Sequence, residues 1–294
     1  MFNWLRQWGN IRKAAGNVLS MNMRNLGYVY PHNARSDFPI ANDKLLCKEK
    51  LAPLGVPLAK THYSYRYFYE LYNLESDLSR LEEFVIKPSN GSAGNGILVI
   101  VGREEGVWLG ISGRRYDISA LQRHISDIIF GVYSFDNQDA AIIEERVVQH
   151  PKINQLFDRG LADVRLIMFQ HQPVQAMSRV PTIASDGKAN LHQGAVGLGI
   201  DLKTGCSSDA MLKGTAISHH PDSGAPLLGV EIPFWDEIIY HATRTAEAVP
   251  LKYLGIDIAI GEQGPVLLEI NARPGLEIQN VNRQAMRPVL EAIR

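Results

Sequence analysis

The 294-residue sequence has only two cysteines, Cys47 and Cys206, and they lie far apart. Because neither belongs to a CxxC pair, this usage argues against a disulfide framework and a zinc knuckle, and it fits a reducing cytoplasm. The chain also lacks an excess of one charge, with 30 Lys plus Arg against 31 Asp plus Glu. Without surplus positive charge to neutralise a phosphate backbone, nucleic acid is not expected as a main partner.

Long apolar runs are missing as well. No uncharged segment approaches the length of a membrane span, and the N-terminus lacks the apolar centre of a secretory signal, so we expect a soluble protein. The first residues do have apolar side chains at helical spacing above basic ones, namely Phe2, Trp4, Leu5, Trp8 and Ile11 with Arg6, Arg12 and Lys13. Such a helix fits a membrane surface or a protein partner, but packing on its own protein is the favoured interpretation.

The composition is that of a globular protein, with 45% hydrophobic and 21% charged residues. The length allows one large α/β domain or two to three smaller lobes. Strands are predicted at 84–88, 96–101 and 140–148, with a β pair over 163–180 that turns at Gln172 and Pro173 and another over 255–271. Helices are predicted at 74–83, at 233–249 and within 41–59, where Asn42 is the expected N-cap and Gly55 follows the end. Because these elements interleave without βαβ periodicity, an α+β fold is favoured over one doubly wound sheet.

A glycine-rich loop separates the first two strands, and its lysine, Lys87, comes before the glycines. This order matches neither a Walker A loop nor a dinucleotide fingerprint, and the chain lacks the HRD and DFG signatures of kinases. The remaining functional interpretation is a flexible hairpin lid whose amides and hydroxyls approach a polyphosphate while the strand supplies a fixed positive charge. The loop residues concerned are Ser89, Gly91, Ser92, Gly94 and Gly96. An ordinary Gly/Ser hairpin turn is the alternative.

The predicted C-terminal hairpin contains a second polar group. Glu269 and Asn271 are two residues apart on one strand, so both point to one face. If Pro265 stays out of the ladder, Ile260 pairs with Val266, and Asp257 then lies opposite Glu269. Three oxygen donors of this kind suit Mg²⁺ or Mn²⁺ shared with nucleotide phosphates, whereas the alternative is two unrelated surface acids.

Taken in order, several segments resemble the ATP-grasp superfamily, and the resemblance covers roughly residues 40–280. They are "NDKLLCKEKLAPLGVP", "FVIKPSNGSAGNG", "IIEERVV", "DVRLIM", "MSRV", "NLHQGAVGLGIDL", "GIDIAI" and "LLEINARPG". Within the superfamily the chain resembles α-L-glutamate ligase-like proteins related to the ribosomal-protein glutamate ligase. It is also similar to a sugar-transfer-associated ATP-grasp branch in "MNMRNLGYVYPHNAR" and "HHPDSGAPLLGVEIPFWDEI".

The resemblance implies an ATP-grasp fold in which two α+β lobes clasp the nucleotide. It implies an N-terminal region with a lysine helix at 1–80, a central lobe with the glycine-rich lid at 81–145, and a C-terminal lobe with the metal site at 146–294. It also places Lys44 and Lys87 at the nucleotide phosphates, with Lys87 near the adenine as well. The further nucleotide-binding residues that it implies are Glu144 and Val147 at the adenine hinge, with Glu145 as an equal neighbour, and Asp163 at the ribose. Solvated lysines and surface salt bridges are the alternatives for these residues.

The residues that the resemblance implies at the γ-phosphate and the acceptor carboxylate are Arg165, Arg179, Asn190 and His192. Arg273 stands where the related ligase has a small residue, so an additional guanidinium there would read a second acidic group or a sugar phosphate. An ion pair with Glu277 is the structural alternative. His192 is a candidate general base by location only, and a buried structural histidine is the favoured interpretation.

The implied reaction is an ATP- and Mg²⁺-dependent carboxylate–amine ligation through an acyl phosphate, with release of ADP. Its partners would be a small-molecule or peptide carboxylate acceptor and an amine donor, and glutamate is suggested by kinship alone. The competing hypothesis is a nucleotide-binding sensor or assembly module without ligase activity. The intact metal triad argues against that alternative, because a sensor would tolerate its loss.

Overall fold

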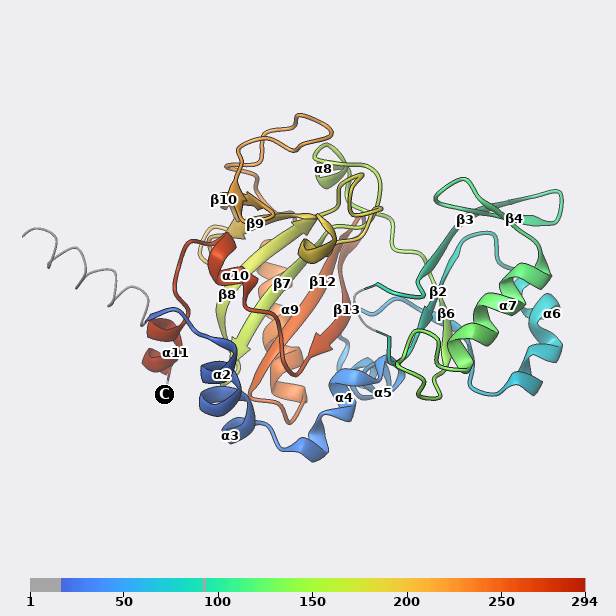
Figure 1. The fold of residues 1–294 in the computed structure, drawn as a ribbon, viewed down its shortest axis with the longest axis horizontal. Helices are drawn as coiled ribbons and strands as arrows, with labels where there is room; N and C mark the ends of the chain where they lie inside the picture. The colour runs from blue at the N-terminus through green and yellow to red at the C-terminus, as the bar shows by residue number, and fades with distance from the viewer. Residues whose placement is uncertain (1–16, 92–93, 294) are drawn as a thin grey trace, which may run out of the picture.

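The computed structural model describes residues 17–91 and 94–293, which form two lobes side by side (Figure 1). The predicted N-terminal helix, with Phe2 and Trp8, lies outside the described residues. Each lobe has its own antiparallel sheet and its own cluster of buried apolar side chains. Interleaved helices and antiparallel strands confirm the predicted α+β class. The division at 80/81 and 145/146 stays a prediction, although β1 at 61–65 belongs to the small-lobe sheet.

The small-lobe sheet has the strand order β1-β6-β2-β3-β4-β5. Its strands are β1 (Thr61–Tyr65), β2 (Phe84–Pro88), β3 (Leu98–Glu104), β4 (Val107–Gly110), β5 (Arg115–Tyr116) and β6 (Ala141–Glu144). It also contains η4 (Phe68–Asn73), α6 (Leu74–Leu78) and α7 (Ile118–Ile129). Helix α7 packs Leu121, Ile125 and Ile128 against Phe84 and Ile86 of β2, and this pairing closes the core of the lobe. The predicted hairpin around the glycine loop is confirmed, because β2 and β3 pair antiparallel.

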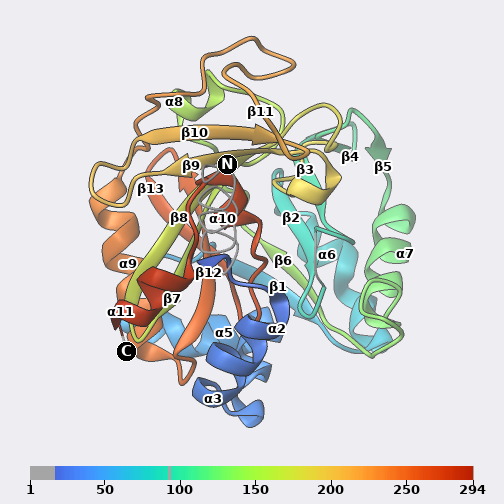
Figure 2. The same cartoon turned by 60° about the vertical axis from the view of Figure 1, so that its left-hand side comes forward.

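The large-lobe sheet has the order β11-β10-β9-β8-β7-β12-β13. Its strands are β7 (Asp163–Phe169), β8 (Gln172–Val180), β9 (Val196–Ile200), β10 (Ser207–Leu212), β11 (Thr215–Ala216), β12 (Tyr253–Gly261) and β13 (Gly264–Asn271). Three helices pack on it, α9 (Trp235–Ala248), α10 (Glu277–Val281) and α11 (Arg287–Ile293), and the loops carry α8 (Pro151–Asn154) and η5 (Leu191–Gln193). Figure 2 shows how β9 and β10 extend this sheet away from β12.

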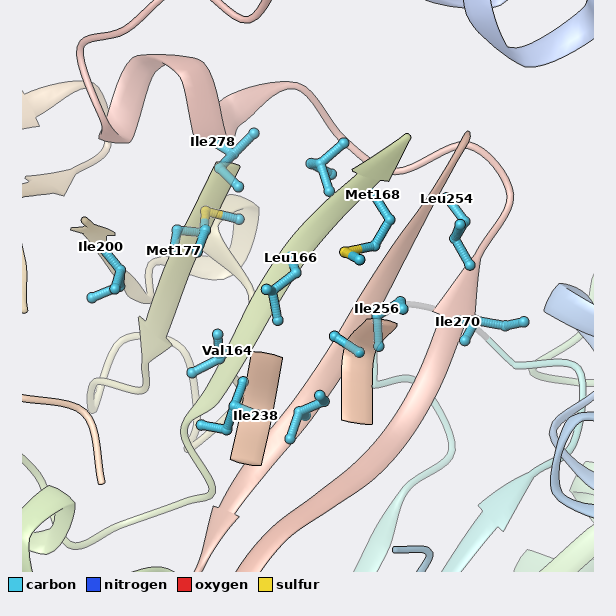
Figure 3. Packing of buried hydrophobic residues seen from close by; sticks show 14 of the residues in the cluster. Val164, Leu166, Met168, Met177, Ile200, Ile238, Leu254, Ile256, Ile270 and Ile278 are labelled. Atoms are coloured by element: carbon cyan, nitrogen blue, oxygen red, sulfur yellow. The ribbon is translucent and has the colours of Figure 1, made fainter. Parts of the chain in front are cut away.

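The two faces of the large-lobe sheet differ in chemistry because strand side chains alternate. Val164 and Leu166 of β7 and Ile256 of β12 lie in the apolar cluster with Ile238 of α9 (Figure 3). The intervening positions point to the opposite face, and the ladder aligns Asp257 of β12 with Arg165 of β7 there. One face therefore anchors the sheet on its helix, and the other is free to carry charged side chains.

The N-terminal helices cross the edge of the large lobe before the chain enters the small one. They are α2 (Met21–Arg24), a π-helical turn η1 (Asn25–Val29), α3 (Tyr30–His32), η2 (Arg35–Asp37), α4 (Pro39–Asn42), α5 (Lys44–Leu51) and η3 (Ala52–Leu54). Asn42 was the predicted N-cap of α5, but it ends α4, and Asp43 accepts from the amides of Leu45 and Leu46 instead. Gly55 does terminate the segment, in the left-handed conformation that suits glycine at a helix end.

Two predicted turns differ from the observed ones. The β7–β8 turn lies at Gln170 and His171 rather than Gln172 and Pro173, because both residues adopt the left-handed φ that a tight two-residue hairpin requires. In the C-terminal hairpin Pro265 joins the ladder and pairs with Ile260, so the predicted pairing of Ile260 with Val266 is wrong. A bulge next to Leu268 then restores the predicted register beyond it.

Two further predicted elements are shorter in the structure, namely α6 at 74–78 and β6 at 141–144. Within the two described ranges, no helix combines the length and the apolar character needed to cross a membrane.

Candidate active site

The centre of the candidate site is the strand pair β12–β13. Asp257 lies directly opposite Glu269, as the sequence predicted. The Nδ2 atom of Asn271 lies 3.3 Å from Oδ2 of Asp257 and 3.4 Å from Oε1 of Glu269. The three residues of the predicted oxygen triad therefore lie together on one face of the large-lobe sheet, and metal binding by them stays a prediction.

Two arginines from the neighbouring strands hold the Asp257 carboxylate. Arg165 on β7 donates from Nε and Nη2 at 2.8 and 2.6 Å, and Arg179 on β8 donates from Nη2 at 2.9 Å. Asp257 is 1% exposed. Burial by itself raises the pKa of Asp257, but the two guanidinium groups outweigh it and hold this pKa well below its usual range. The carboxylate is thus ionised and compensated inside the protein.

Asp163 was predicted at the ribose, and the structure places it in the same network. Its two carboxylate oxygens accept from Nε and Nη2 of Arg179, and its side chain is buried. Burial raises the pKa of Asp163 to about 6, against the opposing guanidinium of Arg179, and the charge of Asp257 adds to the rise. In this structure Asp163 orients Arg179, and a contact with a ribose stays a prediction.

Lys44 connects the acidic strands to the glycine loop. Its Nζ atom lies 3.5 Å from Oε2 of Glu269 and donates to the carbonyl of Gly91 at 2.7 Å. Ser89, at the start of the loop, donates to the Asp43 carboxylate at 2.5 Å. The first turn of α5 therefore joins the small-lobe loop to the large-lobe strands.

Lys87 occupies the end of β2, as predicted, but its charge is already paired. Its ammonium and that of Lys48 each contact one oxygen of the buried Glu144 carboxylate. Lys48 also donates to the Ala59 carbonyl at 2.8 Å and to Thr61 Oγ1 at 3.1 Å, which satisfies all three of its donors. Lys48 was missed by the sequence reasoning, although it lies four residues after Lys44 on the same face of α5.

A second missed residue supports the base of the glycine loop. Asp139 is buried and accepts from the Asn90 amide at 3.0 Å, from Asn90 Nδ2 at 2.8 Å and from the Ser134 hydroxyl. No sequence motif marks this residue, because its partners come together only through the fold. Further along the loop, Gly94 and Gly96 have φ values of +75°, which other residues rarely adopt. The predicted hydroxyl donor Ser92 lies outside the described residues.

The residues predicted at the adenine hinge lie where the chain passes between the lobes, and their contact with a nucleotide stays a prediction. The amide of Glu145 donates to the Lys60 carbonyl at 2.8 Å, and its side chain is exposed. Val147 lies next to Gly261, because a Cβ on that glycine would be 3.5 Å from Val147 Cγ1. Glu145 therefore contacts the residue before β1 of the small-lobe sheet, and Val147 contacts β12 of the large-lobe sheet.

The remaining predicted catalytic residues lie on turns outside the Asp257 network. Asn190 caps η5 by accepting from the His192 amide at 3.0 Å, and the His192 side chain is exposed rather than buried. Arg273 places its guanidinium carbon 5.6 Å from the centre of the Phe38 ring instead of beside Glu277, which accepts from Asn280.

The triad fits a hard divalent cation in donor chemistry. Glu269 is 30% exposed in its side chain, and its contacts to Lys44 and Asn271, the ones found among the described residues, are long, so its oxygens are accessible. Carboxylate and amide oxygens are the ligands that Mg²⁺ takes in proteins. In the parts of the chain that the structure describes, no group of three or more His, Cys, Asp or Glu side chains is arranged to hold a metal. The triad itself supplies two carboxylates and one amide.

Comparison with known proteins identifies a family and relatives for this chain. The family described as sugar-transfer-associated ATP-grasp matches residues 23–294. A curated relative, a probable alpha-L-glutamate ligase from Trichodesmium erythraeum (strain IMS101), is 24% identical over 237 residues, which is 81% of this chain and 58% of the relative. The chain thus spans less than two thirds of that protein.

The solved structures that match the chain are more distant in sequence. D-alanine–D-alanine ligase from Helicobacter pylori has a TM-score of 0.49 at 14% identity, over 86% of this chain and 60% of that one. The ATP-grasp ligase PsnB in complex with a minimal precursor has a TM-score of 0.46 at 16% identity, over 89% and 62%.

Proposed function

The chain belongs to the sugar-transfer-associated ATP-grasp family, and we propose that it is an ATP- and Mg²⁺-dependent ligase that joins a carboxylate to an amine. In this proposal the nucleotide is clasped between the two lobes and leaves as ADP. The name of the curated relative, a probable alpha-L-glutamate ligase, supports glutamate or another amino acid as one substrate. The acceptor would be a small molecule or peptide with an acidic group, and a cytoplasmic location remains an expectation.

One observation carries the proposal. Lys44 contacts both Glu269 of the oxygen triad and the carbonyl of Gly91 in the glycine loop. Two features that are more than 170 residues apart in the chain therefore meet at one lysine. A phosphate chain lying between a glycine loop and a hard-cation site is the arrangement that phosphoryl transfer requires.

The chain's own residues would mainly bind and orient. A carboxylate oxygen of the acceptor attacks the γ-phosphorus, the bond to the β-phosphate oxygen breaks, and an acyl phosphate forms. The amine then attacks the acyl carbon, loses a proton and displaces phosphate. Arg165 and Arg179, fixed by buried carboxylates, would stabilise charge developing on the transferring group. A bound Mg²⁺ would supply neutralisation of the phosphate oxygens at Asp257, Glu269 and Asn271.

The ligase hypothesis is tested by acceptor-dependent ADP release. Purified protein with ATP and Mg²⁺ should release ADP when pooled amino acids, acidic peptides or amino sugars include its substrates. Glu269→Gln should lower this rate by at least about 100-fold, the size of losing one preorganised stabilising group. Asp257→Asn should do the same, but Glu269 is the cleaner site because its side chain is 30% exposed, whereas Asp257 is buried.

Glu262→Gln is the matched control, since Glu262 is an exposed acid at the turn of the same hairpin. It should leave the rate unchanged. Absence of ADP release with every acceptor pool, or full activity in both triad variants, would contradict the proposal.

A further inference from the structure

The N-terminal segment 17–34 is attached to the large lobe at three points, on α10, at the start of β12 and at the turn after β13. Leu19 exchanges hydrogen bonds with the Gln279 side chain, from its amide at 2.9 Å and to its carbonyl at 3.1 Å. Asn33 accepts from the amides of Lys252 and Tyr253 and donates to the Tyr253 carbonyl at 2.7 Å. Figures 1 and 2 both place α2 and α3 beside this sheet. The third point of attachment is Arg24.

Arg24 is a buried cation, with 8% of its surface exposed. Its Nη1 atom donates to the Pro274 carbonyl at 2.6 Å, and Nε and Nη2 both donate to Oδ1 of Asn25 at 3.0 and 2.9 Å. Among the described residues, no carboxylate forms an ion pair with it. Burial lowers the pKa of Arg24, which reflects the cost of placing this charge away from water.

Burying a charge without a counter-ion costs free energy, so packing alone does not explain Arg24. The residue that accepts its hydrogen bond suggests a function for it. Pro274 follows Asn271 by three residues and packs directly on Gly255, where a Cβ would lie 2.6 Å from Pro274 Cβ. Gly255 is also the ladder partner of Asn271. The guanidinium of Arg24 thus binds the turn after β13 at the residue that packs on Gly255, the ladder partner of Asn271.

The asparagine next to Arg24 holds the guanidinium in this direction. Asn25 begins the π-helical turn Asn25–Val29, a geometry that is rare and often occurs at functional sites. At the start of this turn, Oδ1 of Asn25 accepts from two guanidinium nitrogens of Arg24, while Nη1 donates to the Pro274 carbonyl.

We propose that Arg24 is a positioning residue that orients Asn271 for metal binding. The N-terminal segment therefore contributes to the metal site. This inference rests on the proposed function. Arg24 contacts no triad atom itself and acts through the backbone of the turn at Arg273 and Pro274. Groups that orient a metal ligand typically change metal affinity by about 10-fold to 100-fold.

The test measures Mn²⁺ affinity on the full chain, by electron paramagnetic resonance with a non-hydrolysable ATP analogue present. Arg24→Met keeps the aliphatic stem and removes the donors, so the Mn²⁺ dissociation constant should rise about 10-fold. Asn25→Ala leaves the arginine in place but unoriented, and it should raise the constant in the same direction by less. Asn33→Ala is the matched control, because it loosens the same segment at Tyr253, away from the turn.

Each result has a defined meaning. If Arg24→Met binds Mn²⁺ with wild-type affinity, or if Asn33→Ala loses as much Mn²⁺ affinity as Arg24→Met does, the positioning role is overturned. Arg24 would then only stabilise the attachment of the N-terminal segment. If Arg24→Met does not fold, unchanged affinity in Asn25→Ala overturns the inference in the same way. If the wild-type protein binds no Mn²⁺ with the analogue, the metal-dependent function itself fails, which is a different outcome from a variant that matches the wild type.

Discussion

At the scale of single residues, two buried carboxylates, Asp257 and Glu144, are each held between two cations. Removing one member of such a group lowers the free energy of unfolding far more than removing a surface ion pair does, because an uncompensated charge stays in the interior. One network lies on the small-lobe sheet and the other on the large-lobe sheet. Their charges are therefore fixed before any substrate arrives.

The substitution Glu144→Gln should lower the stability of the protein for this reason. The change leaves Lys87 and Lys48 without their carboxylate, so the free energy of unfolding at pH 7 should fall by about 3–5 kcal/mol. Although burial acts to raise the pKa of Glu144, the two ammonium groups outweigh it, and the folded-state pKa is below its usual value. A lowered carboxyl pKa adds stability above the unfolded-state value of about 4.3, and that stability is lost as the pH falls through the folded-state pKa.

Urea unfolding between pH 7 and pH 3 checks both parts of this prediction. The gap between wild type and Glu144→Gln should be largest at neutral pH and should narrow below about pH 4. Glu83→Gln, which breaks the partly exposed pair with Arg146, is the control and should cost no more than about 1 kcal/mol. A gap that widens on acidification would refute the assignment of Glu144 as the ionised partner.

At the scale of elements, the β12–β13 hairpin depends on close packing as well as on its register. Its two-residue turn and the bulge at Leu268 together leave Glu269 and Asn271 on one face. Gly255, the partner of Asn271, has no room for a side chain because Pro274 lies against it. The turn after β13 is therefore seated in a space that only glycine leaves open.

Gly255→Ala should displace this turn. Overpacking of a well-packed position typically lowers the free energy of unfolding by about 1–3 kcal/mol. We expect thermal or urea unfolding to show a loss of that size. Gly102→Ala on β3 is the control, since a Cβ there would meet no atom within 4 Å. Equal free energies of unfolding for Gly255→Ala and Gly102→Ala would contradict this prediction. The turn would then move away from the hairpin without any loss of stability.

At the scale of the whole molecule, the two lobes differ in how the chain builds them. All six strands of the small-lobe sheet come from residues 61–144, and its buried cluster lies entirely within 65–143. The buried cluster of the large lobe instead combines residues from 19–56 with residues from 153–290. The chain passes between the lobes at 145–150, where Val148 and His150 pair with the end of β12.

The segment 56–147 should therefore fold on its own. We expect circular dichroism of a folded α+β protein and a single cooperative thermal transition, but no Mg²⁺-dependent nucleotide binding, because Lys44 and the oxygen triad are missing. The same segment with Ile125→Asp is the control and should be unfolded, since Ile125 is fully buried in the lobe's core. An unfolded parent segment would show that the small lobe needs the large one for its stability.

Much of the architecture could be predicted from local pattern. The glycine hairpin, helix α9, the α+β class and the family were all predicted correctly, because strand alternation, helical spacing and ordered motifs are properties of neighbouring residues. The opposition of Asp257 and Glu269 was also predicted, although through a register that the structure corrects near Pro265. A shorter turn and a bulge happened to give the same alignment.

The partners of the charged residues were decided only by the tertiary structure. Glu144 meets Lys87 because β6 pairs with β2, and it meets Lys48 because that residue of α5 lies against Thr61 of β1. Asp163 meets Arg179 because β7 and β8 pair there. Arg24 reaches Pro274 across 250 positions of sequence. Sequence by itself therefore determined which elements form and which side chains share a face, since these follow from the periodicity of the backbone. Which charges compensate one another depends on strand order and lobe packing, and no local pattern records them.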